Sequence, residues 1–359
     1  MKKRWLFLWL WLIPISVLLT VIAKKNPDFA EYYSINIYPF FVRAFGFFSS
    51  KIIESTTEII IFVLIIAILI LTVVIIIGSM KYKTLKYIKI YIFGLVSFFS
   101  VMYFVFVLFC GINYYRYEFT NYSGLEIKKS STEELIELCE LLVEDANEYR
   151  AKLDTHEGTV KLSDDNYYGT AKRAGNSMDK LSQEYKILKG NFSSPKPVRQ
   201  SKIMSYFNIT GVFFPFTFEA NVNVHIPPYQ IPSVMLHELV HLRGFMREDE
   251  ANFISYLASI KSGYDDFYYS GTMSALTHSM NALYSTDYDE FVRLYSLYSE
   301  DVRKDIDFSR NYWKQFDTKI ADAANRVNDV YLKAHNQEDG VRSYGRMVDL
   351  LLAYYRQEA

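Results

Sequence analysis

Two histidines and a glutamate lie together in the segment His-Glu-Leu-Val-His at residues 237–241. On a helix, His237 and His241 project from one face, so both imidazoles can bind a single zinc ion. Glu238 is rotated from that face and can accept a proton from a water that zinc acidifies, then pass it to a leaving amine. This spacing predicts zinc-assisted hydrolysis of a peptide bond. The alternative is an amphipathic helix that carries two surface histidines.

A catalytic zinc needs a third protein ligand, and acidic side chains follow shortly after the second histidine. On an unbroken helix Glu248 would lie about 16 Å along the axis from His237, which is out of reach. The chain must therefore turn back, and Gly244 is suited to that turn. On the returning helix Glu248 and Asn252 share a face. We expect Glu248 to be the ligand, with Glu250 as the alternative, and Asn252 to accept a hydrogen bond from one of the histidines.

The first third of the chain holds three strongly apolar stretches, each about long enough to cross a hydrocarbon core of ~30 Å. They predict transmembrane helices over about residues 5–23, 57–78 and 90–112. A polar stripe, which a buried helix of a soluble core usually carries, is absent from the second stretch. A cleaved signal peptide is the alternative for the first stretch.

Basic residues gather before the first stretch and in the short loop between the second and third. They are Lys2, Lys3 and Arg4 before the first stretch, and Lys81, Lys83, Lys86 and Lys89 between the second and third. Such residues mark cytoplasmic loops, so the domain after the third stretch is expected outside the cytoplasm. We therefore predict a multi-pass protein of the cell membrane, with an anchor over residues 1–113 and an extracytoplasmic domain over residues 114–359.

The beginning of the predicted domain is helical. Ser131 and Glu134 have the spacing of a capping box, which predicts a helix that continues to about Leu153. A proline-punctuated stretch at residues 189–198 predicts a loop that leads toward the centre of the domain.

The residues before the histidine motif have a different pattern. Over residues 211–225, aromatic and β-branched residues alternate with small or polar ones, which predicts a strand. Pro215 restricts at least the first half to an edge strand or a bulge, and Pro232 fits the first turn of the helix with residues 237–241. The fold class we expect is α+β, mainly helical, with a small sheet.

The motif and the acids after it resemble a known pattern. HELVH followed by EDEAN resembles the gluzincins, in which HExxH precedes ExxxD; the glutamate binds zinc and the aspartate orients a histidine. The resemblance implies zinc binding by Glu248 and orientation by Asn252, with asparagine standing in place of the aspartate. The longer run FPFTFEANVNVHIPPYQIPSVMLHELVHLRGFMREDEANF, with SYGRMVDLLLAYYR near the end, resembles an uncharacterised bacterial family of membrane-anchored zinc metallopeptidases, a domain of unknown function. That resemblance implies a zincin-like domain and says nothing of the substrate.

Zincins generally place a strand upstream of the HExxH helix, where it pairs with an extended substrate. The resemblance therefore implies substrate binding by Ala220, Asn221, Val222, Asn223 and Val224. An ordinary edge strand is the alternative for these residues. Zincins also add a tyrosine, histidine or arginine that stabilises the oxyanion. Tyr344 and Arg346, in the SYGRM segment, are the candidates here.

Charge and composition limit the partners. The net charge of −1 and the lack of a basic patch with interleaved aromatics argue against nucleic acid. The expected partners are the lipid bilayer and a peptide or exported protein as substrate. We expect a membrane-anchored metallopeptidase; the alternative function is a catalytically silent zinc-binding sensor or scaffold in the membrane.

Overall fold

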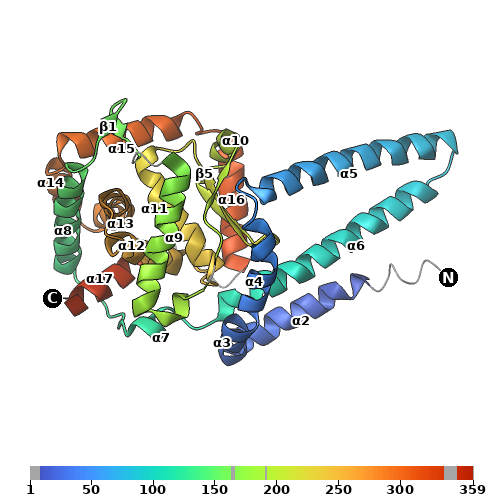
Figure 1. The fold of residues 1–359 in the computed structure, drawn as a ribbon, viewed down its shortest axis with the longest axis horizontal. Helices are drawn as coiled ribbons and strands as arrows, with labels where there is room; N and C mark the ends of the chain where they lie inside the picture. The colour runs from blue at the N-terminus through green and yellow to red at the C-terminus, as the bar shows by residue number, and fades with distance from the viewer. Residues whose placement is uncertain (1–8, 163–165, 191, 335–345, 359) are drawn as a thin grey trace.

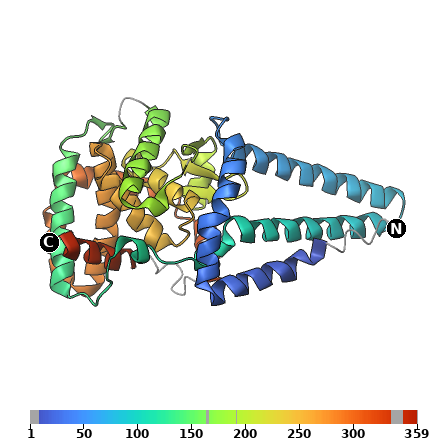
Figure 2. The same cartoon turned by 60° about the horizontal axis from the view of Figure 1, so that its bottom comes forward.

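The computed structural model describes residues 9–162, 166–190, 192–334 and 346–358. The chain is mainly helical and has small sheets. Long apolar helices extend from one side of a helical domain, as two views show (Figures 1 and 2). The prediction of a mainly helical chain with a small sheet is thus confirmed.

Two of the apolar helices form a hairpin, α5 (Thr56–Lys81) and α6 (Lys86–Phe109). Both are long and apolar enough to cross a membrane, and they occupy the second and third predicted stretches. The most apolar window of α5 is 0% buried and that of α6 is 22% buried, whereas a helix in a soluble core would be mostly buried. The lysine-rich turn that joins them lies at the end far from the domain (Figure 1). The compartment on each side stays a prediction.

The first predicted span is only partly described. Helix α2 (Leu12–Lys25) packs against α6, and the Ser100 hydroxyl donates to the carbonyl oxygen of Trp9 at 2.6 Å. Residues 1–8 lie outside the described part, so a span over residues 5–23 stays a prediction. Among the described residues, α5 and α6 are the helices with the length and hydropathy of a span.

Two helices fill the segment between α2 and α5: α3 (Pro27–Asn36) and α4 (Tyr38–Ser49). Helix α4 lies across the domain-side ends of the long helices (Figures 1 and 2). The Tyr33 hydroxyl on α3 donates to the carbonyl of Leu108 at 2.8 Å. These helices therefore join the apolar hairpin to the domain.

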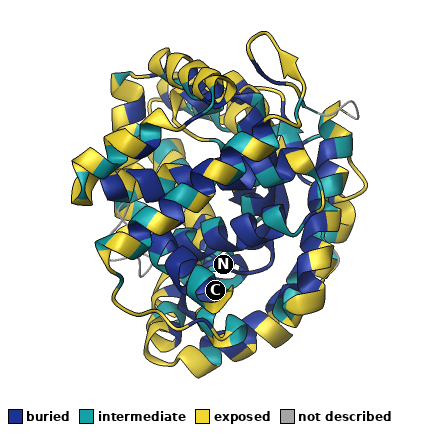
Figure 3. Ribbon diagram, turned by 90° about the vertical axis from the view of Figure 1, so that its left-hand side faces the viewer, coloured by how far each residue is buried: buried dark blue, intermediate teal, exposed yellow. Residues whose placement is uncertain are grey.

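The domain is built around α13 (Asp265–Thr286), which packs against α8, α11, α12 and α17. Buried residues gather at the centre, inside helices whose outer faces are exposed (Figure 3). Helix α8 (Thr132–Arg150) begins at the predicted capping box, since Ser131 and Glu134 exchange side-chain and backbone hydrogen bonds. The other helices and turns of the domain are η1 (Gly111–Tyr115), α7 (Thr120–Ser123), α9 (Asn166–Glu184), η2 (Lys186–Leu188), α10 (Ser201–Tyr206), η3 (Pro228–Gln230), α11 (Ile231–Leu242), α12 (Glu248–Ile260), α14 (Tyr288–Ser296), α15 (Glu300–Lys314), α16 (Lys319–Ala334) and α17 (Arg346–Glu358).

A three-stranded sheet lies beside α11, with the order β3 (Lys196–Val198), β5 (Glu219–Asn223), β4 (Gly211–Phe214). Strand β5 pairs in parallel with β3 and antiparallel with β4. Strand β4 is an edge strand that ends before Pro215, as predicted. A separate two-stranded sheet joins β1 (Thr155–His156) to β2 (Thr159–Val160).

Two predictions about this region are wrong. The stretch 189–198 is not entirely loop, because its last three residues form β3; Pro197 is tolerated since β3 is at the other edge of the sheet. Strand β5 is central and fully buried. Asn221 and Val222 have strand partners on both sides, Ala220 pairs with β4 and Asn223 with β3, so the strand is not the free edge that pairing with a substrate requires. Val224 lies just beyond the strand.

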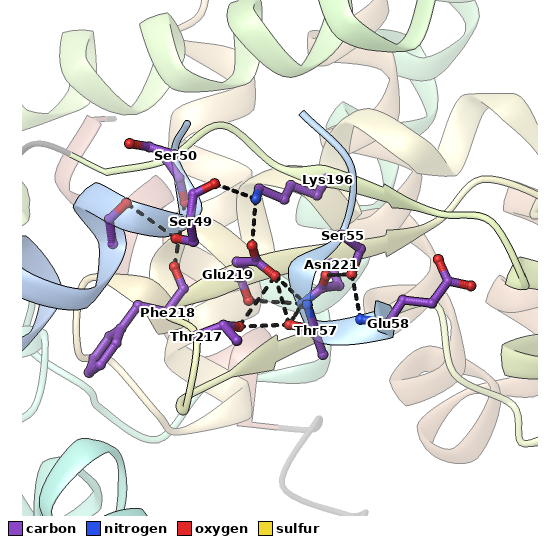
Figure 4. Close-up of polar contacts among 12 residues, drawn as sticks. Ser49, Ser50, Ser55, Thr57, Glu58, Lys196, Thr217, Phe218, Glu219 and Asn221 are labelled. Atoms are coloured by element: carbon purple, nitrogen blue, oxygen red, sulfur yellow. Dashed lines mark hydrogen bonds and ion pairs between the residues drawn. The ribbon is translucent and has the colours of Figure 1, made fainter. Parts of the chain in front are cut away.

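A buried polar network fastens the start of α5 to the sheet (Figure 4). Lys196 forms an ion pair with Glu219 and donates to the carbonyl of Ser49 at 2.6 Å. Glu219 also accepts from the backbone N–H and the hydroxyl of Thr57, each at 2.8 Å. All four residues are buried. One ion pair and its hydrogen bonds thus connect the sheet to the end of α4 and the start of α5.

Replacing Lys196 with methionine should strongly destabilise the chain. The substitution leaves the Glu219 carboxylate buried without its cation, a change that costs about 3–5 kcal/mol. The measurement is the thermal unfolding midpoint of the full chain in detergent. Lys152→Met is the control, since Lys152 pairs with Glu148 at the exposed surface and its loss should leave the midpoint unchanged. Equal midpoints for the two variants would show that the network does not hold the fold.

Candidate metal centre

The histidine motif lies on α11, and the chain reverses directly after it. Pro232 is in the first turn of the helix, as predicted. At the other end, Gly244 has φ 87°, and the N–H of Phe245 bonds to the carbonyl of Val240. This left-handed glycine turn ends the helix and lets α12 run back beside it. A Cβ at Gly244 would also come within 3.4 Å of the Tyr38 ring.

The reversal brings Glu248 to the two histidines. The Nε2 atoms of His237 and His241 are 2.9 Å apart. The Glu248 carboxylate lies 3.2 Å from Nε2 of His237 and 3.6 Å from Nε2 of His241. Ligand atoms of a tetrahedral zinc, each about 2.0–2.2 Å from the ion, lie roughly 3.4 Å from one another. Two imidazoles and one carboxylate at these separations fit a zinc ion.

Each histidine is oriented by its other ring nitrogen. Nδ1 of His237 is 2.8 Å from Oδ1 of Asn252, and Nδ1 of His241 is 2.8 Å from the carbonyl oxygen of Phe245. A carbonyl can only accept, so Nδ1 of His241 carries the hydrogen and Nε2 keeps its lone pair. This is the arrangement that ligating histidines require.

The charges of the histidines differ. Burial, and then the positive charge of His237, lower the pKa of His241 to about 4. Burial also acts to lower the pKa of His237, but the hydrogen bond and charge of Glu248 outweigh it and raise that pKa to about 9. His241 is therefore neutral at neutral pH, whereas a cation that binds His237 must displace a proton.

Glu238 is buried beside this cluster. Burial raises its pKa to about 8, and the negative charge of Glu248 adds to the effect. The backbone N–H of Phe213, on β4, donates to the carboxylate, while Oε2 has no hydrogen-bond partner among the described residues. Strand β4 passes very close, because a Cβ on Gly211 would lie 2.5 Å from Oε1 of Glu238. The ionised form of Glu238 is thus destabilised, and Oε2 can accept a hydrogen bond that the described residues do not supply.

The other predicted site residues lie elsewhere. Glu250 is bonded to Arg247 at 2.8 Å and accepts the backbone N–H of Phe119 at 2.5 Å, so it is not part of the cluster. Nε of Arg346 is 3.7 Å from the Asp249 carboxylate. Tyr344 lies outside the described residues.

Two further polar side chains, which the sequence did not single out, come close to the cluster. His278, on α13, has its pKa lowered to about 4 by burial and then by the charge of His237. The Tyr331 hydroxyl, on α16, is 2.8 Å from that of Tyr114. Burial, and to a smaller degree the charge of Glu248, raise the pKa of both tyrosines. Neither His278 nor Tyr331 has ligand spacing to the motif, and the chain contains 30 tyrosines, so residue pattern alone could not have found them.

Comparison with known proteins reveals one relationship. The chain matches no curated protein and no solved structure. The model of one family matches residues 33–352, a range that begins in α3, ends in α17 and includes the whole candidate metal centre. The chain therefore belongs to the family described as Protein of unknown function (DUF3810).

Proposed function

We propose that the chain is a membrane-anchored zinc metallopeptidase with a zincin-like domain. His237, His241 and Glu248 would hold the metal, and Glu238 would be the general base. The observation that carries this proposal is the meeting of two Nε2 atoms and a carboxylate at zinc-ligand separations, next to a buried carboxylate with an available oxygen.

A zinc ion held by these residues would lower the pKa of a bound water and polarise the scissile carbonyl. Glu238 would take the proton from the attacking water and deliver it to the leaving amine. Its burial favours this role, since a carboxylate with a raised pKa binds a proton more strongly. Asn252 and the Phe245 carbonyl would keep both imidazoles in the required tautomer.

Strand β4 is the part of the sheet on which an extended peptide would bind. Its outer side has no strand partner among the described residues, and Gly211 and Phe213 place its backbone beside Glu238. A peptide that adds to this edge would carry its backbone past the base. Strand β4 thus takes the substrate-binding role that the sequence assigned to the residues of β5. His278 and Tyr331, whose pKa values respond to the charges of His237 and Glu248, are the candidates for a neutral donor that stabilises the oxyanion.

Replacing Gly211 with alanine should impair catalysis and leave zinc binding intact. The new Cβ would lie 2.5 Å from Oε1 of Glu238 and 2.8 Å from Cγ1 of Val234, so the carboxylate must move. A misplacement of this kind costs about 100-fold in rate. Gly175→Ala is the control, because a Cβ there meets nothing within 4 Å. Peptide hydrolysis and zinc content of both variants are measured, and full activity of Gly211→Ala would contradict the geometry.

The test of the proposed function uses the full chain in liposomes, loaded with zinc and offered a peptide library. We expect cleavage that stops on chelation, resumes with zinc and is absent in Glu238→Gln. A library that stays intact in the presence of zinc-loaded protein would overturn the assignment.

The second candidate function is a zinc-binding sensor or scaffold without catalysis. The observation in its favour is the buried network that joins α5 to β5, a strand that in turn packs on α11. Such a connection suits the relay of a signal between a membrane helix and the metal centre. Stoichiometric zinc without hydrolysis is the outcome that favours this function.

We also propose that the domain is extracytoplasmic, in a multi-pass protein of the cell membrane. The lysines between α5 and α6 support this orientation. Protease added to intact cells should cleave the domain and spare the turn between the two helices. Protection of the domain would place it in the cytoplasm.

A further inference from the structure

Helix α4 has an exposed face made of phenylalanines. Phe40, Phe47 and Phe48 expose 62%, 58% and 72% of their surface. They are spaced i, i+7 and i+8, so they share one side of the helix. Tyr38 and Val42, on the opposite side, are buried against the protein. Both sides of α4 are therefore apolar, which water does not favour for a surface helix.

The position of α4 indicates what covers this face. The helix lies across the domain-side ends of α5 and α6, and α5 begins a few residues after α4 ends (Figures 1 and 2). Between the two helices, Ile53 is 69% exposed, and the apolar window of α5 is 0% buried. Arg43 and Lys51 are exposed nearby, and the Lys51 ammonium lies 4.9 Å from the centre of the Phe47 ring. Aromatic rings with adjacent basic groups are typical of the headgroup region of a bilayer.

The buried side of α4 contacts α11, the helix that carries His237 and His241. The Tyr38 hydroxyl donates to the carbonyl of Leu242, the last residue of α11, at 3.1 Å. At the end of α6, the Cys110 thiol lies 3.6 Å from the sulfur of Met246, in the turn between the motif and Glu248. The end of α11 and the turn that leads to Glu248 thus contact α4 and the end of α6.

We propose that the phenylalanine face of α4 rests in the headgroup region of the bilayer, and that it holds the metal centre at the membrane surface, where the centre acts on polypeptides attached to the same membrane. The substrate part of this inference rests on the proposed peptidase function; the lipid contact does not.

The lipid contact is tested by labelling. Phe48→Cys is labelled with a nitrobenzoxadiazole dye in the full chain, reconstituted in phosphatidylcholine and phosphatidylglycerol vesicles; Cys110 and Cys139 are buried and should not react. The control is Tyr288→Cys, a 58% exposed site on α14, at the far end of the domain. We expect blue-shifted emission at position 48 and quenching by nitroxide-bearing lipids, with neither at position 288. Phe40→Cys is the second variant should Phe48→Cys not fold. Equal emission and equal quenching at positions 48 and 288 would overturn the inference. The face of α4 would then not contact lipid, and a protein partner would be the remaining occupant.

The substrate class is tested with one cleavable peptide presented in three forms: free in solution, on a lipid anchor with a spacer of about 2 residues, and on an anchor with a spacer of about 20 residues, which reaches ~70 Å when extended. A metal centre at the surface should cleave the short-spacer form at least as well as the long-spacer form. Phe40→Ser, Phe47→Ser and Phe48→Ser together should reduce short-spacer cleavage at least tenfold and leave cleavage of the free peptide unaffected. Tyr284→Ser with Tyr288→Ser should change neither.

The outcomes separate the two proposals. Cleavage of the free and long-spacer peptides without the short-spacer one would overturn the surface location and leave the peptidase function standing. No cleavage of any form by the zinc-loaded chain would overturn the peptidase function and the substrate class together, while the dye result would still decide the lipid contact.

Discussion

Replacing Glu238 with glutamine should reduce peptide hydrolysis by about 10²–10⁴-fold, the contribution typical of a general base. Glutamine has nearly the same shape but cannot accept the proton of the attacking water. Zinc content should stay at the wild-type level, because the ligand atoms belong to His237, His241 and Glu248. Steady-state hydrolysis and metal analysis of the same preparation measure the two effects. Full activity of Glu238→Gln would show that Glu238 is not the general base.

The same substitution should stabilise the zinc-free chain at neutral pH. The pKa of Glu238 is raised from 4.5 in the unfolded chain to about 8 in the folded one, so the folded state binds the proton more tightly. Stability then falls as pH rises through that interval, at about 1.36 kcal/mol per unit. At pH 7 the expected gain from glutamine is therefore about 3 kcal/mol. Glu250→Gln is the control and should destabilise, because it weakens the ion pair with Arg247. A Glu238→Gln chain that unfolds earlier than wild type would contradict this.

Replacing Glu248 with alanine should weaken zinc binding by more than about 100-fold, beyond the 10–100-fold typical of losing a residue that only orients a ligand. Its carboxylate is 3.2 Å and 3.6 Å from the two Nε2 atoms. Glu250→Ala should keep the wild-type affinity and lower stability, since it leaves the Phe119 N–H without its acceptor and removes the buried carboxylate that pairs with Arg247.

Competition with a chromophoric chelator measures both affinities. A zinc affinity that depends on Glu250 and not on Glu248 would reverse the assignment of the third ligand. Wild-type affinity in both variants would mean that neither carboxylate binds the metal.

The parts of the site that follow local periodicity could be predicted. The i, i+4 spacing of His237 and His241, the glycine turn after them and the shared face of Glu248 and Asn252 all depend on residues within about four turns of helix. The structure has the turn at Gly244, and Asn252 bonded to His237. Backbone geometry over so short a segment leaves few alternatives.

The parts that depend on tertiary packing could not be predicted. His278 on α13 and Tyr331 on α16 interact electrostatically with His237 and Glu248, and no pattern near the motif indicates these interactions. The pairing of Lys196–Val198 with β5 joins three residues, one of them proline, to a strand more than twenty residues away. That pairing made β5 central and moved the accessible edge to β4. Strand order depends on such distant contacts, which the alternation of residues in a single strand does not specify.

X-ray absorption at the zinc edge of the purified full chain tests the metal centre most directly. We predict one zinc per chain, with only nitrogen and oxygen ligands at about 2.0–2.2 Å and the scattering of two imidazoles, reduced to one in His241→Ala. A chain that takes up no zinc, or one whose zinc has sulfur at about 2.3 Å as from the nearby Cys110, would contradict the centre formed by His237, His241 and Glu248.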